Sequence, residues 1–310
     1  MIDFDKALTE LGLPTRDASE LPTSGKTFAD GGHYRLEVSG IERFSAMQTM
    51  VETADQLGVA IHRGIVSVGG ATTLSFAELH DIAKLGAERR IELIMTPGPR
   101  RTWDLGPQVR TAEGVGSGWR TRGVDAMRYL LADIERGLEA GLRGFLILDE
   151  GVMSTVCQLR ARGYFPPETI FKMSVYSGHG NPAGARLVES LGADSLNPLA
   201  DLTSAMLAAI RQTIKIPLDV YIYLVEQMGG FNRMWEAAEI VRVSSPTYLK
   251  FEPGESEGIT YRPYAEESYH QKLIHEKVRF AAITHELIQR QNSQLKPSPA
   301  GSSDLVVPKP

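Results

Sequence analysis

Four carboxylates stand at or near the ends of short apolar segments, where they could act on a bound molecule: Glu37, Asp149, Glu150 and Glu252. Asp149 and Glu150 are the strongest pair, because the apolar run 144–148 stops at two acids followed by a glycine. Carboxylates that meet at one place can serve as general acid and base, or can hold a divalent metal ion, for which Asp149, Glu150 and Glu252 are the candidate ligands. Each of the four can equally cap a following helix or pair with an arginine.

Two further side chains have the right chemistry for catalysis. Lys250 lies between apolar neighbours, where a desolvated amine would have a lowered pKa and could form a Schiff base with a carbonyl substrate. Lys250 and Glu252 share one face of a predicted strand, so they could instead neutralise each other. His179 stands in a loop of small residues and could act as a base or a metal ligand, or remain a solvated loop histidine.

Arginines gather in a long segment, residues 97–123, that has neither helical nor strand periodicity. So long an irregular segment is uncommon in a compact domain and is usually functional. Arginine forks suit carboxylate and phosphate groups, and two tryptophans could close over a ligand. We therefore predict a lid that binds an anion, with a solvated insertion or an oligomer contact as the alternative. The side chains concerned are Arg100, Arg101, Arg110, Arg120, Arg122, Trp103 and Trp119.

Eight short apolar segments rich in β-branched residues alternate with amphipathic segments of helical period. Eight strands that are each followed by a helix predict an α/β fold, a (β/α)8 TIM-type barrel. The rival, an open doubly wound sheet, would carry a glycine-rich fingerprint after its first strand, and residues 39–42 do not form one. The predicted strands are 34–38, 61–68, 91–96, 144–148, 170–175, 193–196, 218–224 and 248–251.

In such a barrel the active site lies at the C-terminal ends of the strands. This rule brings the predicted catalytic residues Asp149, Glu150, His179, Lys250 and Glu252 to one mouth of the barrel. It also adds side chains that could bind a substrate there. These binding candidates are Glu37, Arg63, Arg100, Arg101, Asn181, Asn197 and Tyr221.

The two ends of the chain differ in composition from the barrel domain, which is expected over residues 31–292 and includes the arginine-rich loop 97–123. Residues 1–30 are polar and broken by prolines and glycine, which predicts an N-terminal lead-in with a short helix. Residues 293–310 are rich in Ser, Pro, Lys and Gln, which predicts a disordered tail. The long helix 266–291 has an apolar face that must cover the barrel's own flank or form a homo-oligomer contact.

Composition narrows the class of protein further. The 310 residues carry 33 basic and 38 acidic side chains, a net charge of −5, which disfavours a nucleic-acid binder. Cys157 is the single cysteine, so the chain cannot build a four-cysteine iron–sulfur cluster.

No apolar run reaches the roughly 18 residues of a membrane span, and the first residues lack a secretory pattern. The glycine run 114–118 lacks the Gly-Lys-Ser/Thr of a nucleotide-binding loop. A cytoplasmic protein without a nucleotide cofactor is expected.

Several motifs in the middle of the chain follow one another in a recognisable order. Residues 140–152 contain a strand that ends in acid and glycine, residues 170–175 are followed by Asn181, residues 191–194 contain Gly-Ala-Asp, and residues 216–220 read Ile-Pro-Leu-Asp-Val. In this order they resemble the collagenase-like peptidase family of unassigned catalytic type, over about residues 75–225.

The resemblance implies a barrel fold and a peptidase activity, and also relatives that assist RNA or quinone modification through a four-cysteine iron–sulfur cluster. This chain departs from that pattern in three places. It has one cysteine, Asp219 stands where the family has Glu, and Tyr221-Ile-Tyr223 stands where His-Gly is common. The chain is therefore expected to be a divergent member without the cluster.

These observations favour an enzyme that acts on a small carboxylate- or phosphate-bearing substrate. Arginines of the third loop would bind the anion, while carboxylates and His179 would handle protons or a divalent metal ion in a hydrolysis or a lysis. One alternative is a Schiff-base lyase or aldolase that works through Lys250. The other is a non-catalytic barrel that serves as a partner or scaffold for another protein.

Overall fold

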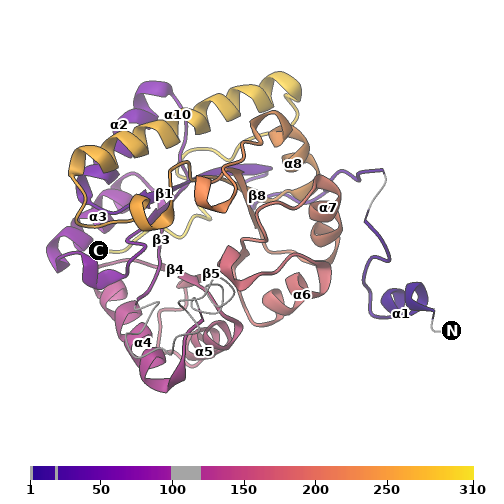
Figure 1. Cartoon of the computed structure of the whole chain (residues 1–310), viewed down its shortest axis with the longest axis horizontal. Helices are drawn as coiled ribbons and strands as arrows, with labels where there is room; N and C mark the ends of the chain where they lie inside the picture. The colour runs from indigo at the N-terminus through magenta and orange to yellow at the C-terminus, as the bar shows by residue number, and fades with distance from the viewer. Residues whose placement is uncertain (1–2, 18–19, 99–119) are drawn as a thin grey trace.

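Eight parallel strands close into a barrel in which each strand pairs with its neighbours in sequence and β8 pairs with β1 (Figure 1). The computed structural model describes residues 3–17, 20–98 and 120–310. The arrangement confirms the predicted (β/α)8 barrel. The strands are β1 (Tyr34–Ile41), β2 (Arg63–Val66), β3 (Glu92–Met95), β4 (Gly144–Ile147), β5 (Ile170–Met173), β6 (Ser195–Leu196), β7 (Leu218–Tyr223) and β8 (Thr247–Phe251).

Helices surround the barrel, and the chain passes through at least one α-helix after each strand (Figure 1). Side-chain caps explain where several of them begin: Ser75 Oγ accepts from the Glu78 amide at 3.1 Å, and Thr203 Oγ1 accepts from the Met206 amide at 3.3 Å. The helices are α1 (Phe4–Glu10), α2 (Phe44–Leu57), α3 (Phe76–Glu88), α4 (Gly123–Glu139), α5 (Glu150–Ala161), α6 (Pro182–Ser190), α7 (Ser204–Thr213), α8 (Ala237–Ser244), α9 (Glu257–Thr260) and α10 (Glu267–Gln291).

The strands alternate between an apolar outer face and a charged inner face. In β1, Leu36 and Val38 belong to the apolar core between strands and helices. On the other face of β1, Arg35, Glu37 and Ser39 are also buried: Arg35 and Ser39 bond to residues of the neighbouring strand β8, and Glu37 bonds to Lys172 of β5. Part of the inside of this barrel is therefore occupied by ionised groups that must satisfy one another.

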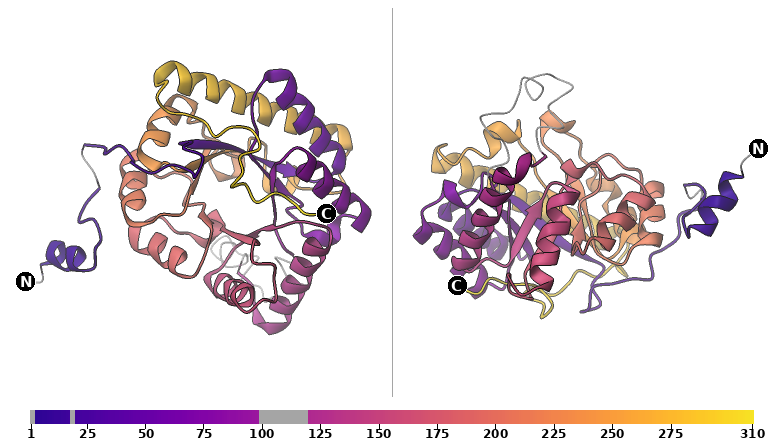
Figure 2. Two further views of the ribbon diagram at one scale, coloured as in Figure 1. Left: turned by 180° about the vertical axis from the view of Figure 1, so that it is seen from behind. Right: turned by 90° about the horizontal axis from the view of Figure 1, so that it is seen from below.

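The C-terminal residues cross the N-terminal end of the barrel, as the yellow segment in the left view of Figure 2 shows. Arg35, inside the barrel, donates from Nε to Ser298 Oγ at 2.9 Å and from Nη2 to Asp304 Oδ1 at 2.5 Å. The Val306 amide donates to Glu92 Oε2 at 3.2 Å. The structure thus differs from the predicted disordered tail, because polar side chains and amides of residues 293–310 satisfy charges at this open end.

Removing residues 293–310 should lower the free energy of unfolding by about 3–5 kcal/mol, because Arg35 would lose its bonds to Ser298 and Asp304 and Glu92 would lose the Val306 amide. Urea denaturation of the shortened chain measures the loss. Deleting residues 1–12 is the matched control, because α1 has no buried residue. Equal stability of the full-length and tail-less chains would contradict a structural role for the tail.

The long helix α10 packs beside α2 and β1 (Figure 1). Its apolar residues Ile274, Val278, Ala281 and Ile288 are fully buried within this chain. The barrel therefore covers that face by itself, and a homo-oligomer through α10 stays a prediction. None of the helices among the described residues is long and apolar enough to cross a membrane.

Candidate active site

Glu37 lies at the centre of a charged network inside the barrel. Lys172 Nζ donates to both of its carboxylate oxygens at 2.6 Å. Arg63 Nη1 lies 3.2 Å and Lys250 Nζ 3.9 Å from the same carboxylate. Burial by itself would raise the pKa of Glu37, but attraction to Lys172, Lys250 and Arg63 lowers it to about 2. Glu37 is therefore ionised at neutral pH and is held by three cations.

Arg63 joins this network to its other acids. Its Nη1 donates to Asp219 Oδ1 at 2.8 Å, its Nε donates to Glu92, and its guanidinium lies 3.4 Å from the centre of the Tyr248 ring. Arg63 and Glu37 were expected to bind substrate, but their charges are satisfied inside the protein. Substrate binding by either residue stays a prediction. In this structure both residues stabilise the interior of the barrel through their ion pairs.

A second group of side chains surrounds Glu252, directly after β8. Tyr221 donates to Glu252 Oε2 at 2.8 Å, Tyr261 donates to Oε1, and Lys250 Nζ lies 3.1 Å from Oε2. We call Glu252, Tyr221, Tyr261, Lys250 and Lys277 the Glu252 cluster; all five are buried. Burial would raise the pKa of Glu252, but the two lysines and the two tyrosine hydroxyls lower it.

Lys277 reaches the cluster from α10, where β1 forms a bulge. The pairing of β1 with β2 shifts between Ser39 and Ile41, and Lys277 Nζ donates to the Ser39 carbonyl at 2.7 Å. The residue between them must be glycine: Gly40 has a φ of 95°, and a Cβ there would lie 2.8 Å from Lys277 Nζ. Burial lowers the pKa of Lys277 to about 8, even though Glu252 raises it.

The pKa of Lys250 shifts in the opposite direction to that of Lys277. Burial would lower its pKa, but Glu252 and Glu37 raise it above the ordinary value. Its ammonium also lies 4.5 Å from the centre of the Tyr221 ring, a favourable cation–π contact. Lys250 is therefore protonated and paired, which is unsuited to attack on a carbonyl. The ion pair between Lys250 and Glu252, which was the alternative to a Schiff base at Lys250, is present.

Replacing Lys277 by methionine should abolish a rise in stability on the alkaline side of neutrality. The pKa of Lys277 is about 8 in the folded chain against an ordinary 10.5. Between about pH 8 and pH 10.5, Lys277 keeps its proton in the unfolded chain but has lost it in the folded chain. Raising the pH in this range therefore stabilises the fold. The wild type should gain about 1 kcal/mol per pH unit relative to K277M. Urea unfolding between pH 7.5 and 9.5 measures this difference.

The control for that experiment is Lys272→Met, since Lys272 lies exposed on the same helix. The difference between wild type and K272M should stay constant over the same pH range. A constant difference between wild type and K277M would show that Lys277 keeps its ordinary pKa.

The rim at the end of β4 is held by backbone and side-chain contacts. Asp149 caps α5, with Oδ1 accepting from the Val152 amide at 2.8 Å and Oδ2 from the Thr121 amide at 3.1 Å. Glu150 pairs with Arg120, and His179 Nε2 lies 2.8 Å from Glu150 Oε1. Burial would raise the pKa of Glu150, but its bond with Arg120 lowers it. The structure thus brings Glu150 and His179 together, while Asp149 serves as a helix cap.

The other predicted binding residues have local partners. Asn181 caps α6, because its Oδ1 accepts from the Gly184 amide at 2.9 Å. Asn197 Nδ2 donates to the Asp219 carbonyl at 2.7 Å. Arg100 and Arg101 lie outside the described residues, as do the other members of the arginine-rich loop up to Trp119.

The described residues do not form the metal site considered for Asp149, Glu150 and Glu252. In the ranges that the structure describes, no three His, Cys, Asp or Glu side chains come together as a possible metal-binding group. Both oxygens of Asp149 accept from backbone amides, and both oxygens of Glu252 accept from tyrosines. The donor set therefore does not fit a divalent ion held by these three residues.

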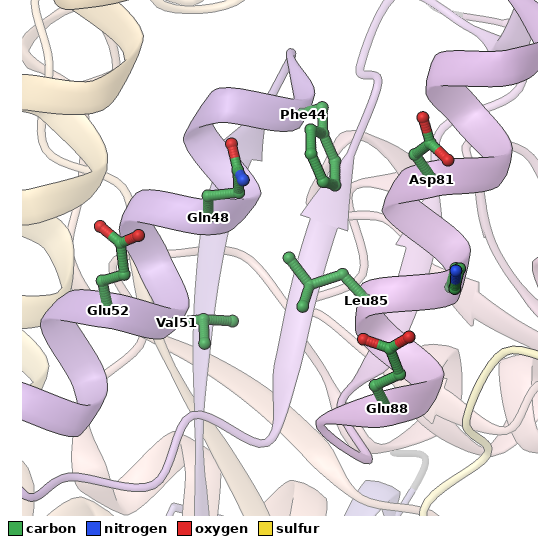
Figure 3. A pocket seen from close by; sticks show the side chains of 8 residues that line it. Phe44, Gln48, Val51, Glu52, Asp81, Leu85 and Glu88 are labelled. Atoms are coloured by element: carbon green, nitrogen blue, oxygen red, sulfur yellow. The ribbon is translucent and has the colours of Figure 1, made fainter.

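A groove of about 310 Å³ lies outside the barrel between α2 and α3 (Figure 3). Phe44, Val51 and Leu85 contribute apolar side chains, and Glu52 and Glu88 lie toward one end of it (Figure 3). This groove lies between the outer helices, and its carboxylates Glu52, Asp81 and Glu88 outnumber its one lysine, so it would repel an anion. It is not the site where a small anionic substrate is expected.

Sequence reasoning missed Lys172, Lys277 and Tyr261, although two of them leave a signal. Lys172 interrupts an otherwise apolar strand, and Lys277 stands within the apolar stripe of α10 beside Ile274 and Val278. A lysine in a buried stripe needs a partner inside the fold. Tyr261 gives no such signal, because it lies in an irregular stretch after α9.

Comparison with known proteins finds no family and only weak likenesses to solved structures. No protein-family model matches this sequence, and no curated protein does. The YdjI aldolase from Escherichia coli K12 is 11% identical, with 86% of this chain and 92% of that chain covered and a TM-score of 0.49. D-psicose 3-epimerase from Clostridium cellulolyticum is 10% identical, with 82% and 99% covered and a TM-score of 0.47. A U32 peptidase is 14% identical, with 77% and 99% covered and a TM-score of 0.41.

These likenesses concern the barrel only. At such identities and TM-scores, neither the aldolase, the epimerase nor the peptidase assigns an activity to this chain. The resemblance of residues 75–225 to the collagenase-like peptidases is therefore carried no further than the barrel fold.

Proposed function

We propose that this barrel is an enzyme that transfers protons on a small carboxylate- or phosphate-bearing substrate, in a hydrolysis or a lysis. The Glu252 cluster is the observation that carries the proposal. It lies at the C-terminal ends of β8 and β1, where barrels place their active sites. One buried carboxylate, two tyrosine hydroxyls and Lys250 supply a proton acceptor and proton donors within hydrogen-bond or ion-pair distance, and Lys277 Nζ lies 5.7 Å from the centre of the Tyr261 ring.

Within the cluster, Lys277 and Glu252 suit different tasks. A pKa of about 8 lets Lys277 exchange a proton near neutral pH, which is the condition for efficient general acid or base catalysis. Glu252 and Lys250 form the fixed ion pair that keeps the surroundings polar. The hydroxyls of Tyr221 and Tyr261 could donate to an oxygen of the substrate in place of Glu252.

Arginines at the rim would hold the anionic group of the substrate. Arg120 donates from Nη2 to the Ser177 carbonyl at 3.1 Å and pairs with Glu150, and its side chain remains 37% exposed. An incoming carboxylate or phosphate can therefore share its guanidinium. Arg100 and Arg101 belong to the same proposal on sequence grounds.

Entry of a substrate requires Tyr261 to move. Its ring packs on Ile65, Val68, Ile94 and Leu146, which form an apolar half of the barrel interior. Its hydroxyl bonds to Glu252. Displacing Tyr261 would leave one apolar wall opposite a group of charged side chains, the usual make-up of a small-molecule site.

A Schiff-base lyase is the second candidate, with Lys277 rather than Lys250 as the amine. Among the described residues, no carboxylate lies within ion-pair distance of Lys277, whereas Lys250 is paired with Glu252 and Glu37. The unprotonated amine would attack a carbonyl carbon and release water to give an imine. Borohydride would reduce that imine to a stable secondary amine, so mass spectrometry of chain treated with keto acids should locate the adduct on Lys277.

A screen of small carboxylates and phosphomonoesters by thermal unfolding tests the enzyme proposal. A ligand that binds the folded chain stabilises it by RT ln(1 + L/Kd), where L is the free ligand concentration, and so raises the unfolding midpoint. We expect at least one small carboxylate of the screen to raise the midpoint, with that response lost in Glu252→Gln. A chain that responds to none of them and co-purifies with another protein would favour the scaffold alternative.

A further inference from the structure

Arg211 is a buried cation that lacks an acid partner. Its side chain is 2% exposed and lies in α7, next to the first residues of β7. Its Nη2 donates to the Ile214 carbonyl, while Nε and Nη1 have no acceptor. Arg211 is in none of the ion pairs found among the described residues. A guanidinium cannot give up its charge, and a buried charge without partners is strongly unfavourable, so an acceptor must be supplied.

A cavity of about 200 Å³ lies beside Arg211. It opens to solvent between the lead-in residues 22–26, α7 and α8, and Arg211, Gln212 and Lys26 line it. Lys26 Nζ donates to the Arg211 carbonyl at 2.8 Å and to the Ile214 carbonyl at 2.6 Å. Its third N–H donor is not used by any described residue. Lys26 therefore has a spare donor at this cavity, and the spare Nε and Nη1 of Arg211 are buried in the side chain that forms part of its wall.

The charges around this cavity are mainly positive, although the whole chain carries −5. The groups that act on Lys26 are the cations Arg211 and Lys215 and a single acid, Glu189. Glu189 Oε1 already accepts from the amides of Lys215 and Ile216, at 2.6 and 3.0 Å. Burial lowers the pKa of Lys26, and it lowers that of Arg211 to about 10. Both changes are effects of burial that the attraction to Glu189 offsets only in part.

We propose that this cavity binds a small oxyanion, inorganic phosphate or the phosphate of a phosphomonoester, through Arg211 and Lys26. Arginine forks and lysine ammonium groups are the usual partners of phosphate. The volume is below the roughly 300–1,000 Å³ of sites for drug-sized ligands, which suits a single anionic group. A bound anion would also join residues 22–26 to α7 at the N-terminal end of the barrel, opposite the Glu252 cluster.

Titration calorimetry and thermal unfolding with inorganic phosphate test this proposal, with sodium chloride at equal ionic strength as the reference. Phosphate should raise the unfolding midpoint of the wild type. Arg211→Met should weaken phosphate binding about tenfold or more, and Lys26→Met should weaken it in the same direction. Without phosphate, R211M should be at least as stable as the wild type, because an apolar side chain replaces an unpaired charge.

Two control variants separate this site from others. Arg279→Met removes an arginine of α10 that pairs with Glu276 at the surface, and it should keep the phosphate response. Glu252→Gln should also keep it, so that failure here and failure of the proposed activity can be told apart. No midpoint shift in the wild type, or an equal shift in R211M, would overturn the proposal. So would a response to acetate that matches the response to phosphate, because it would mean that no phosphate group is recognised.

Discussion

Replacing Arg63 by methionine should lower the free energy of unfolding by about 3–5 kcal/mol, because it leaves buried carboxylates without their shared cation. Glu92 would suffer most, since Glu37 and Asp219 also have Lys172 within 2.6 and 3.4 Å. Urea denaturation of R63M and of the wild type at pH 8 measures this loss.

Arg89→Met is the control for R63M. Arg89 pairs with Asp55 at the surface, where both side chains are exposed, and such pairs contribute about 0–1 kcal/mol. Arg63→Lys should recover part of the lost stability, because it restores one positive charge without the bidentate fork. A loss in R63M no larger than in R89M would mean that the network inside the barrel does not hold it together.

Replacing Glu252 by glutamine should lower kcat by about 10²–10⁴, because it removes the carboxylate that raises the pKa of Lys277, the proposed general acid–base group. The glutamine side chain would keep the shape of the site and could still accept from Tyr221, but it would carry no charge for Lys250 and Lys277. The pKa of Lys277, which Glu252 raises, should fall further below 8. Turnover of a substrate found by the ligand screen measures the change in kcat. The pH dependence of acylation at Lys277 measures the change in the pKa of that lysine.

Glu255→Gln is the matched control, because Glu255 is exposed in the same segment after β8. It should change neither turnover nor the reactivity of Lys277. Full activity in E252Q, with Lys277 titrating as in the wild type, would remove the Glu252 cluster from the catalytic mechanism.

The barrel could be predicted from the sequence because its strands are covered by helices. A continuous apolar run such as residues 144–148 is typical of a buried parallel strand, and the structure has β4 there. The tail 293–310 could not be predicted in this way. Its composition is that of a disordered segment, and only the charges of Arg35 and Glu92 inside the barrel make its order favourable.

Part of the candidate site could also be predicted from the sequence. The rule that barrels react at the C-terminal ends of strands led to Glu252 and Lys250, which do lie together. The pKa of Lys250 depends on acids from two strands, and no local pattern reveals that both reach it. Lys277 comes from a helix and enters through the bulge at Gly40, so a search of strand ends alone does not find it.

A crystal structure of the chain with a ligand from the screen tests the central claim most directly. We expect the ligand at the C-terminal ends of β8 and β1, with its anionic group on an arginine of the rim, a polar atom within hydrogen-bond distance of the Glu252 cluster, and Tyr261 displaced. A ligand bound in the groove between α2 and α3, with Tyr261 still bonded to Glu252, would contradict the account.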